Sequence, residues 1–296
     1  MNLHELSNST RESFHLASLD AERIIVLIRD ALSEDLAGGE DVTSMATIAP
    51  THRSTAEYRT RVAGVVAGIS VAVAVLEMVG LKEIELLQKD GNSVVAGSVL
   101  IRVTGNTREI LLAERTSLNF LSHLSGISTL TRKWVDAVSS FPTKIRDTRK
   151  TTPGFRELEK YAVRMGGGTN HRMSLNESAL IKDNHIVAAG GISEAFSKVR
   201  SAYPTHEIEV EVDTLDQLSE IIALNPDLVL LDNMSVEECA EAVTLVSDRF
   251  PLEASGGLTI ENAREYAQTG VDFLAVGALT HSAKVLDIGL DLKAEI

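Results

Sequence analysis

Cysteine is almost absent from this chain of 296 residues, in which Cys239 is the only one. A single cysteine excludes a disulfide within the chain and a zinc site built from cysteine pairs. It also favours a reducing compartment, so we expect a cytoplasmic protein. The surrounding stretch E-E-C-A-E-A-V is typical of a buried helix position rather than of a catalytic thiol.

The sequence also lacks a hydrophobic run long enough to cross a membrane. The longest run, residues 62–76, has about 15 residues and is interrupted by Gly64 and Gly68, whereas a spanning helix needs roughly 20. We interpret it as a strand that leads into a buried helix. The first residues, M-N-L-H-E-L-S-N-S-T-R-E, lack the basic start and apolar core of a signal peptide. We therefore expect no association with a membrane.

Positive charge is scarce as well, because the formal net charge is -14. No basic stripe exists outside one segment, which argues against nucleic acid as a partner. Hydrophobic residues make up 44% of the chain, which is enough for a sizeable core. The length fits one large α/β domain or two smaller ones.

The exception to this acidity is the segment from Lys144 to Lys182, which holds nine Lys or Arg against four acids. Crowding like charges opposes folding and normally requires a compensating anion. A ligand rich in phosphate or carboxylate is the simplest such anion. The segment reads T-R-K-T-T-P-G-F-R-E-L-E-K-Y-A-V-R-M-G-G-G-T-N-H-R-M-S-L-N-E-S-A-L-I-K-D-N-H from residue 148 to 185.

The succession of helical and strand-like runs along the chain predicts an α/β protein with two domains. Residues 1–20 are polar, and we expect a loosely held amino-terminal segment there. Residues 21–125 mix helical and strand-like runs, which predicts an α/β unit, with a helix over 107–138 that breaks near Gly126. We place a second domain at residues 126–285 and expect residues 286–296 to join the first.

The second half repeats short apolar strands followed by helical segments. Their polar or glycine ends fall at Glu211, Asp232, Ser255 and Gly277, with separations of 21, 23 and 22 residues. Such regular βα units predict a parallel sheet that closes into a barrel-like (β/α) domain. Acids alternate with aliphatic residues in E-I-E-V-E-V-D (207–213), which directs the acids toward the barrel axis.

Two kinds of site follow from these strand ends. Ser255, Gly256 and Gly257 lie between a strand and a helix start, and Gly277 holds the equivalent place in the next unit. Glycines there let backbone amides approach a phosphate, although two tight turns would give the same pattern. Glu211 and Asp232 close successive strands, so their carboxylates could hold Mg²⁺, unless each only caps a helix.

The cations divide into two groups. Arg149, Lys150, His171, Arg172 and Lys182 form the expected anion-binding core, since arginine suits carboxylates and lysine suits phosphate. By contrast, helical spacing favours a solvated helix face for Arg156, Lys160 and Arg164. His123, His185 and His281 taken singly are typical of structural histidines, and Arg115 by itself is typical of a surface position.

These motifs resemble those of the quinolinate phosphoribosyltransferase family, the carboxylating nicotinate-nucleotide pyrophosphorylases of NAD synthesis. The resemblance runs from about residue 24 to 292 in the same order. Only Ser174, Asn176 and Glu177 differ from the residues that are most common in the family at these positions. The matching stretches are the 148–185 segment and E-D-L-A-G-G-E-D-V-T-S, E-R-T-S-L-N-F-L-S-H-L-S-G-I, E-V-E-V-D, L-L-D-N-M, E-A-S-G-G-L and V-G-A-L-T-H-S.

The resemblance implies an amino-terminal α/β sandwich, a barrel-like catalytic domain, and a homodimer whose subunits share the active site. It implies the substrates quinolinate and phosphoribosyl pyrophosphate, with Mg²⁺ as cofactor. The implied catalytic residues are Lys150, Lys182, Glu211 and Asp232, with Glu211 and Asp232 also holding the metal. Quinolinate would be bound by Arg115 of the neighbouring subunit together with Arg149, His171, Arg172 and Lys182, and the phosphates by Lys150, Ser255, Gly256, Gly257, Gly277 and His281.

Three other interpretations stay open at this point. One is a barrel aldolase or lyase with Lys182 as a Schiff-base nucleophile. Another is a phosphosugar-binding protein without catalytic activity. The third is a relative in the same family with a different acceptor, as in its molybdenum-transport-associated branch.

Overall fold

The computed structural model describes residues 3–293 of the chain, which divide into two compact units. Within that range the first unit comprises residues 3–130, 157–166 and 283–293, and the second comprises residues 131–156 and 167–282. The α/β fold class with two domains is confirmed. No helix in the described part of the chain is both long and apolar enough to cross a membrane.

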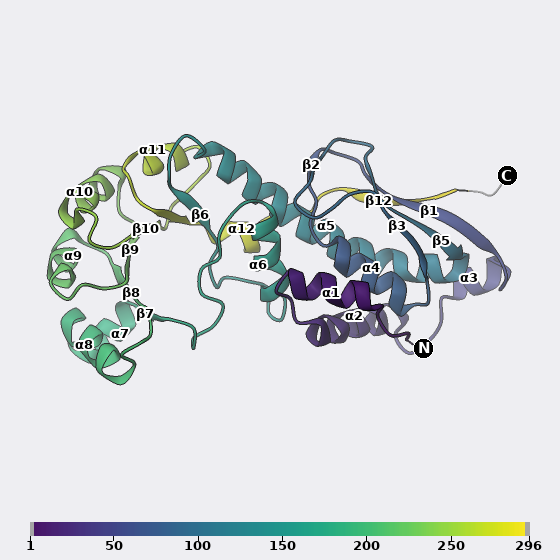
Figure 1. Ribbon diagram of the computed structural model, residues 1–296, viewed down its shortest axis with the longest axis horizontal. Helices are drawn as coiled ribbons and strands as arrows, with labels where there is room; N and C mark the ends of the chain where they lie inside the picture. The colour runs from purple at the N-terminus through teal and green to yellow at the C-terminus, as the bar shows by residue number, and fades with distance from the viewer. Residues whose placement is uncertain (1–2, 294–296) are drawn as a thin grey trace. The chain divides into compact units, whose positions relative to one another are not determined.

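The first unit is built on an antiparallel sheet of four strands in the order β12-β1-β5-β3. Helices cover one of its faces (Figure 1). The hydroxyl of Tyr58 on β1 lies 2.7 Å from that of Ser117 on α5, and α1 and α2 contact α4. The bounds are β1 Arg53–Thr60, β3 Glu83–Leu86, β5 Val99–Asn106, β12 Ile288–Lys293, α1 Asn8–Leu16, α2 Ala21–Leu36, α4 Ile69–Met78 and α5 Thr107–Ala137, with the short elements α3 Val42–Thr47, β2 Gly64–Val65 and β4 Ser93–Val94.

The expectation of a loose segment over residues 1–20 is wrong for the described residues. Helix α1 forms there because the Ser7 side chain accepts a hydrogen bond from the Thr10 amide at its amino end. Phe14 is fully buried, and Leu6 and Leu19 are 7% and 6% exposed. Three apolar side chains therefore anchor an otherwise polar segment to the first unit.

The expected helix break near Gly126 is also wrong, because α5 is continuous through that residue. The glycine at position 126 is explained instead by close packing against another segment of the chain. A Cβ atom there would overlap the carbonyl oxygen of Lys284 and approach Cα of Val285 to 2.9 Å. Glycine thus allows the segment that leads into β12 to pass directly against the helix.

Helix α6 (Arg156–Met165) corrects a third expectation. Residues 157–166 belong to the first unit, although they lie within the stretch assigned to the second domain. Lys160 is fully buried rather than solvated. Glu159 is also buried and lies 3.0 Å from His123 Nε2, and the Tyr161 hydroxyl donates to Asp90 at 2.6 Å. This helix is packed by contacts that its local spacing does not reveal.

A buried acid links the strands of the first unit on the side of the sheet opposite Tyr58. Glu57 on β1 is 1% exposed and lies directly across from Arg102 on β5. It accepts hydrogen bonds from Lys293 at 2.7 Å, Arg102 at 3.0 Å and Arg59 at 2.6 Å. These bonds, that from Lys293 most of all, lower the pKa of Glu57 to about 2.

Replacing Glu57 by Gln is expected to destabilise the protein at pH 7 by roughly 1 to 3 kcal/mol, since charge-assisted hydrogen bonds are lost. The folded-state pKa lies below the ordinary value, so this stabilisation is present above about pH 4.5 and is lost as the pH falls toward 2. Thermal unfolding of both proteins at pH 7 and pH 3.5 checks this. A difference that grows on acidification would contradict it.

The second unit is built on a parallel sheet of six strands in the order β6-β11-β10-β9-β8-β7, with helices between successive strands (Figure 1). A parallel bridge between Arg146 and Thr169 extends it beside β6. Cys239 is buried in a helix as predicted, and burial raises its pKa to about 12. The bounds are β6 Lys144–Arg146, β7 Ala179–Ile181, β8 Ile208–Val212, β9 Leu228–Asp232, β10 Leu252–Ser255, β11 Phe273–Ala275, α7 Asp183–Ala189, α8 Ile192–Ala202, α9 Leu215–Ile222, α10 Val236–Val246, α11 Ala263–Gln268 and α12 Ala278–His281.

Candidate active site

A cavity of about 370 Å³ lies at the carboxyl ends of the parallel strands in the second unit. It brings together eight of the residues singled out from the sequence. Carboxyl ends of parallel strands meet at one edge, which is the usual location of active sites in α/β folds. The lining residues are Thr148, Arg149, Lys150, His171, Arg172, Leu180, Lys182, Glu211, Leu230, Asp232, Glu253, Ser255 and Ala275.

The acids at this edge come from adjacent strands. Glu211 lies on β8 and Asp232 ends β9, where it is paired in register with Ser255 of β10. The Lys182 ammonium group forms an ion pair with the Glu211 carboxylate. Burial and the nearby Asp213 raise the pKa of Asp232, which also accepts a hydrogen bond from the Asn233 side chain at 2.7 Å. Carboxylate oxygens in this arrangement suit a hydrated Mg²⁺ ion.

Two arginines form the most unusual part of the cavity. The Nε atoms of Arg149 and Arg172 are buried and have no hydrogen-bond partner within the described chain. Arg172 donates from Nη1 to the Ser178 carbonyl at 2.6 Å. Burial and the positive charge of Arg149 lower the pKa of Arg172. Two neighbouring guanidinium groups in a partly dry site are suited to bind an anion between them.

The glycine-rich strand ends have specific contacts. Gly256 has a φ of 83°, and a Cβ there would overlap the Asn233 side chain. A Cβ at Gly277 would lie 3.1 Å from Lys150 Cδ and 3.2 Å from His281 Nε2, so these three residues are neighbours. Gly277 directly precedes α12, as expected. Helix α11, however, starts only at Ala263, so Gly256 and Gly257 lie in a turn that precedes the helix rather than at its first residue.

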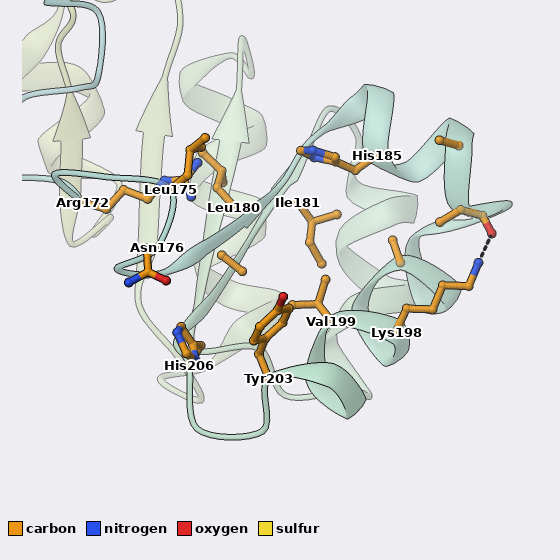
Figure 2. Close-up of a pocket in the computed structure, with 14 residues that line it drawn as sticks. Arg172, Leu175, Asn176, Leu180, Ile181, His185, Lys198, Val199, Tyr203 and His206 are labelled. Carbon is orange, nitrogen blue, oxygen red and sulfur yellow. Dashed lines mark hydrogen bonds between the residues drawn. The ribbon is translucent and has the colours of Figure 1, made fainter.

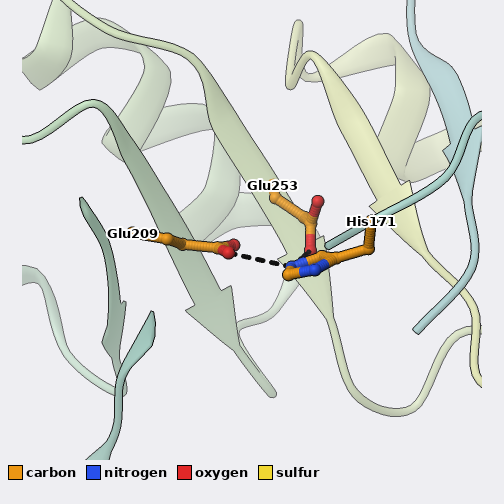
Figure 3. Close-up of side chains that lie close together, drawn as sticks. All are labelled: His171, Glu209 and Glu253. Atoms are coloured by element: carbon orange, nitrogen blue, oxygen red, sulfur yellow. Dashed lines mark ion pairs between the residues drawn. The ribbon is translucent and has the colours of Figure 1, made fainter. Parts of the chain in front are cut away.

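Beneath the rim, His171 contacts a group of buried or half-buried ionisable residues for which the sequence suggested no role. They are Arg146, Glu209 and Glu253. His171 Nε2 is 2.8 Å from a Glu209 oxygen and 3.6 Å from a Glu253 oxygen (Figure 3). Arg146 Nη1 lies 2.7 Å from the other oxygen of Glu253. Burial and the charge of Glu209 raise the pKa of Glu253 to about 7. The period-two pattern could have revealed two of them, since Glu209 precedes Glu211 by two residues and Glu253 precedes Ser255 by two.

Arg115 is the one predicted substrate-binding residue that lies in the first unit, where it is exposed on α5. His281 is exposed at the end of α12, and its Nδ1 lies 2.7 Å from the Ser282 hydroxyl. His185 accepts a hydrogen bond from the Lys182 amide at 3.0 Å, which fixes the backbone at the start of α7. That contact agrees with a structural role for His185.

A second cavity, of about 590 Å³, lies between β7, α7, α8 and the loop that carries Leu175 and Asn176 (Figure 2). Its walls are mainly aliphatic and alanine side chains, with Tyr203 and His206 at one end. None of the described residues that line it is acidic. It shares Arg172 and Leu180 with the smaller cavity but lacks the paired acids and glycines of that site.

An open parallel barrel with cations, paired acids and glycine turns at its carboxyl edge defines a phosphate-handling α/β enzyme. Sequence models of the two domains of quinolinate phosphoribosyl transferase match residues 41–125 and 127–291. The chain belongs to the quinolinate phosphoribosyl transferase family.

Individual relatives agree with this assignment. The chain is 51% identical to the nicotinate-nucleotide pyrophosphorylase [carboxylating] of Mycobacterium leprae, over 90% of this chain and 95% of that protein. It is similar to the solved structure of the nicotinate-nucleotide pyrophosphorylase from Francisella tularensis, with 40% identity, a TM-score of 0.89, and 93% and 98% of the two chains covered. The enzyme of the same name from Ehrlichia chaffeensis gives 40% identity and a TM-score of 0.87, with 90% and 97% covered.

Proposed function

We propose that this protein is a carboxylating nicotinate-nucleotide pyrophosphorylase, a pentosyltransferase of de novo NAD biosynthesis. It transfers the phosphoribosyl group of phosphoribosyl pyrophosphate to quinolinate, and the products are nicotinate mononucleotide, CO₂ and diphosphate. The names of its relatives support this reaction. The structural observation that carries it is the pair of arginines at the cavity, Arg149 and Arg172, whose buried Nε atoms lack partners within the described chain.

Quinolinate fits this part of the cavity because it carries two adjacent carboxylates on a flat ring. The planar forks of Arg149 and Arg172 are suited to bind them, and Lys182 adds a third positive charge at the rim. His171 has a different part in this proposal from the one that the sequence suggested. Its Nδ1 accepts the Arg172 amide at 2.8 Å and its Nε2 lies 2.8 Å from Glu209, so both ring nitrogens already have partners within the protein.

Phosphoribosyl pyrophosphate would lie across the adjacent strand ends. Ser255, Gly256 and Gly257 would receive its 5-phosphate, with Gly277 and His281 close by. Lys150 would contact the diphosphate, since its backbone is held beside Gly277 by a hydrogen bond from the Thr280 hydroxyl to the Lys150 carbonyl at 2.8 Å. Glu211 and Asp232 would bind the ribose hydroxyls and Mg²⁺. When bound, this ion would supply positive charge to the leaving diphosphate.

In the reaction the ring nitrogen forms a bond to C1 of the ribose while the bond from C1 to the diphosphate breaks. A weakly nucleophilic nitrogen favours a loose transition state, in which negative charge grows on the leaving group. Lys150 and Lys182 are placed to stabilise that charge, and each such donor contributes roughly 3 to 4 kcal/mol. The bond to the 2-carboxylate then breaks, CO₂ leaves, and the ring carbon takes a proton. The positive pyridinium nitrogen stabilises the electron pair, so no nucleophilic side chain is needed.

A CO₂-release assay tests the reaction. Purified protein with Mg²⁺ and phosphoribosyl pyrophosphate is offered carboxyl-labelled quinolinate and nicotinate in parallel. We expect labelled CO₂ and nicotinate mononucleotide from quinolinate alone. Diphosphate release with nicotinate and none with quinolinate would show a family member with another acceptor. Binding of phosphoribosyl pyrophosphate with no turnover of either acceptor would show a binding protein.

We further propose a homodimer in which Arg115 reaches the site of the neighbouring subunit. Two observations support this: Arg115 is exposed, and it belongs to the first unit, whereas every other predicted site residue belongs to the second. Arg115→Ala and Lys182→Ala should each be nearly inactive alone. An equimolar mixture of the two variants should regain up to about a quarter of wild-type activity, because about half of its dimers are mixed and one of the two sites in each mixed dimer is intact. Activity that stays at the level of the unmixed variants, although heterodimers form, would exclude a shared site.

A further inference from the structure

Four ionisable side chains form a layer inside the barrel-like sheet, one residue layer below the rim of the active site. Arg146 comes from β6, Glu253 from β10, Glu209 from β8 and His171 from the segment that follows the bridge at Thr169. In the sheet order, β11 separates β6 from β10 and β9 separates β10 from β8. Alternate strands therefore contribute the layer, as in the interior of closed (β/α) barrels.

The layer is one connected chain of contacts that ends at an active-site residue. Arg146 pairs with Glu253 at 2.7 Å, and the two acids flank His171 Nε2 at 3.6 and 2.8 Å (Figure 3). The Arg172 amide donates to His171 Nδ1 at 2.8 Å. A ring nitrogen that accepts a hydrogen bond carries no proton, so the proton of the neutral ring is on Nε2 and is donated to Glu209. His171 thereby transmits the position of the acids to the backbone of Arg172.

The strand-like segment before Arg172 is held on its other side by Asp147. That buried carboxylate accepts the His171 amide at 2.8 Å and the Asn170 side chain at 2.5 Å. The orientation of Arg172 in the anion site is therefore set by contacts on both sides of residue 171.

The composition of the layer is costly for stability. Barrel interiors are usually filled by branched aliphatic residues, and replacing a buried ion pair by such residues is often neutral or stabilising. Glu253 is fully buried and Glu209 is 4% exposed, and one oxygen of each acid has no hydrogen bond within the described chain. Arg146 supplies the positive charge that the cluster needs, so the geometry indicates an ion-pair layer rather than a metal site. Charged residues kept at this cost, directly beneath substrate-binding groups, point to a role in the reaction.

We propose that Arg146, Glu209 and Glu253 are positioning residues for quinolinate, which act through His171 to hold Arg172 in its binding orientation. This inference rests on the proposed function. The proposal predicts an effect on the binding of quinolinate and not of phosphoribosyl pyrophosphate. The reason is that the layer contacts the backbone of Arg172 through His171 and does not contact the glycine turns at the phosphate end. Misplacing a binding group by about 1 Å can cost on the order of a hundredfold in rate.

The test uses two variants of the full-length protein. Glu209→Gln keeps the shape of the side chain but changes the acceptor that faces His171. The double variant Arg146→Met, Glu253→Leu removes both partners of an ion pair together, so neither of them is left buried without the other. We expect the KM for quinolinate to rise about tenfold or more in both, and the KM for phosphoribosyl pyrophosphate to stay within about twofold. The unfolding temperature of the double variant should equal or exceed that of the wild type.

Glu57→Gln is the matched control, because it breaks a buried ion-pair network in the first unit. It should unfold at a lower temperature with an unchanged KM for quinolinate. The inference is overturned if both layer variants bind quinolinate normally, or if both KM values rise together in proportion to lost stability. If the double variant does not fold, Glu209→Gln decides alone. A wild-type protein that releases no CO₂ from quinolinate would instead refute the proposed reaction.

Discussion

Replacing Arg172 by Ala is expected to lower kcat/KM for quinolinate by roughly 150- to 1,000-fold at near-neutral pH. The substitution removes a planar, partly desolvated cation whose hydrogen bonds to a carboxylate are charge-assisted. Losing such an interaction in a low-dielectric site costs about 3 to 4 kcal/mol. Steady-state kinetics with quinolinate varied at saturating phosphoribosyl pyrophosphate measure the effect.

Two further variants make this result specific. Arg172→Lys keeps the charge but not the fork, so it should recover only part of the activity. Arg200→Ala removes another arginine of the second unit, which forms an ion pair with Asp227 outside the lining of the active-site cavity, and should leave kcat/KM within about twofold. Wild-type kinetics for Arg172→Ala would remove the anion site from the proposal.

Replacing Lys150 by Ala is expected to lower kcat by at least about a hundredfold with the fold intact. Lys150 is an exposed residue at the cavity, and its backbone is fixed by Thr280. Its ammonium group is placed to meet charge that develops on the diphosphate only as the bond to C1 breaks. The effect should therefore fall on kcat more than on the KM for phosphoribosyl pyrophosphate. Pre-steady-state measurement of diphosphate release follows the chemical step directly.

The control for Lys150 comes from the same segment of chain. Lys144 is exposed at the start of β6 and does not line the cavity, so Lys144→Ala should behave like the wild type. Lys150→Arg keeps a positive charge and should retain more activity than Lys150→Ala. If Lys150→Ala and Lys144→Ala are equally active, Lys150 has no role in the departure of the leaving group.

The rim of the candidate site could be predicted because it depends on local order in the chain. Each βα unit ends a strand at a fixed residue, and parallel strands place those ends at one edge. Glu211, Asp232 and Ser255 therefore lie together, as their spacing predicted. Lys150 beside Gly277 is a longer-range contact. The strand ends predicted Gly277 at a phosphate site, but only the resemblance to a known family placed Lys150 at the same end.

The connections between distant segments could not be predicted in this way. Helix α6 reads as amphipathic in isolation, but Lys160 is buried because the helix packs within the first unit. Gly126 predicts a helix break from the sequence, but in the structure it leaves space for the backbone of residues 284 and 285, which packs directly against the helix. In both cases residues far away in the sequence decide the local environment. For Gly126 these are residues 284 and 285, and for α6 they are other parts of the first unit.

The sequence by itself determined the two-domain α/β class, the strand ends that carry the site, and the local excess of cations that calls for an anionic ligand. Only the tertiary structure decided which cations face the cavity, that the Nε atoms of Arg149 and Arg172 have no hydrogen-bond partner within the described chain, and that Glu209 and Glu253 flank His171. The reason is physical. Periodicity and charge are properties of neighbours along the chain, whereas desolvation and hydrogen-bond partners depend on which strands the sheet brings together.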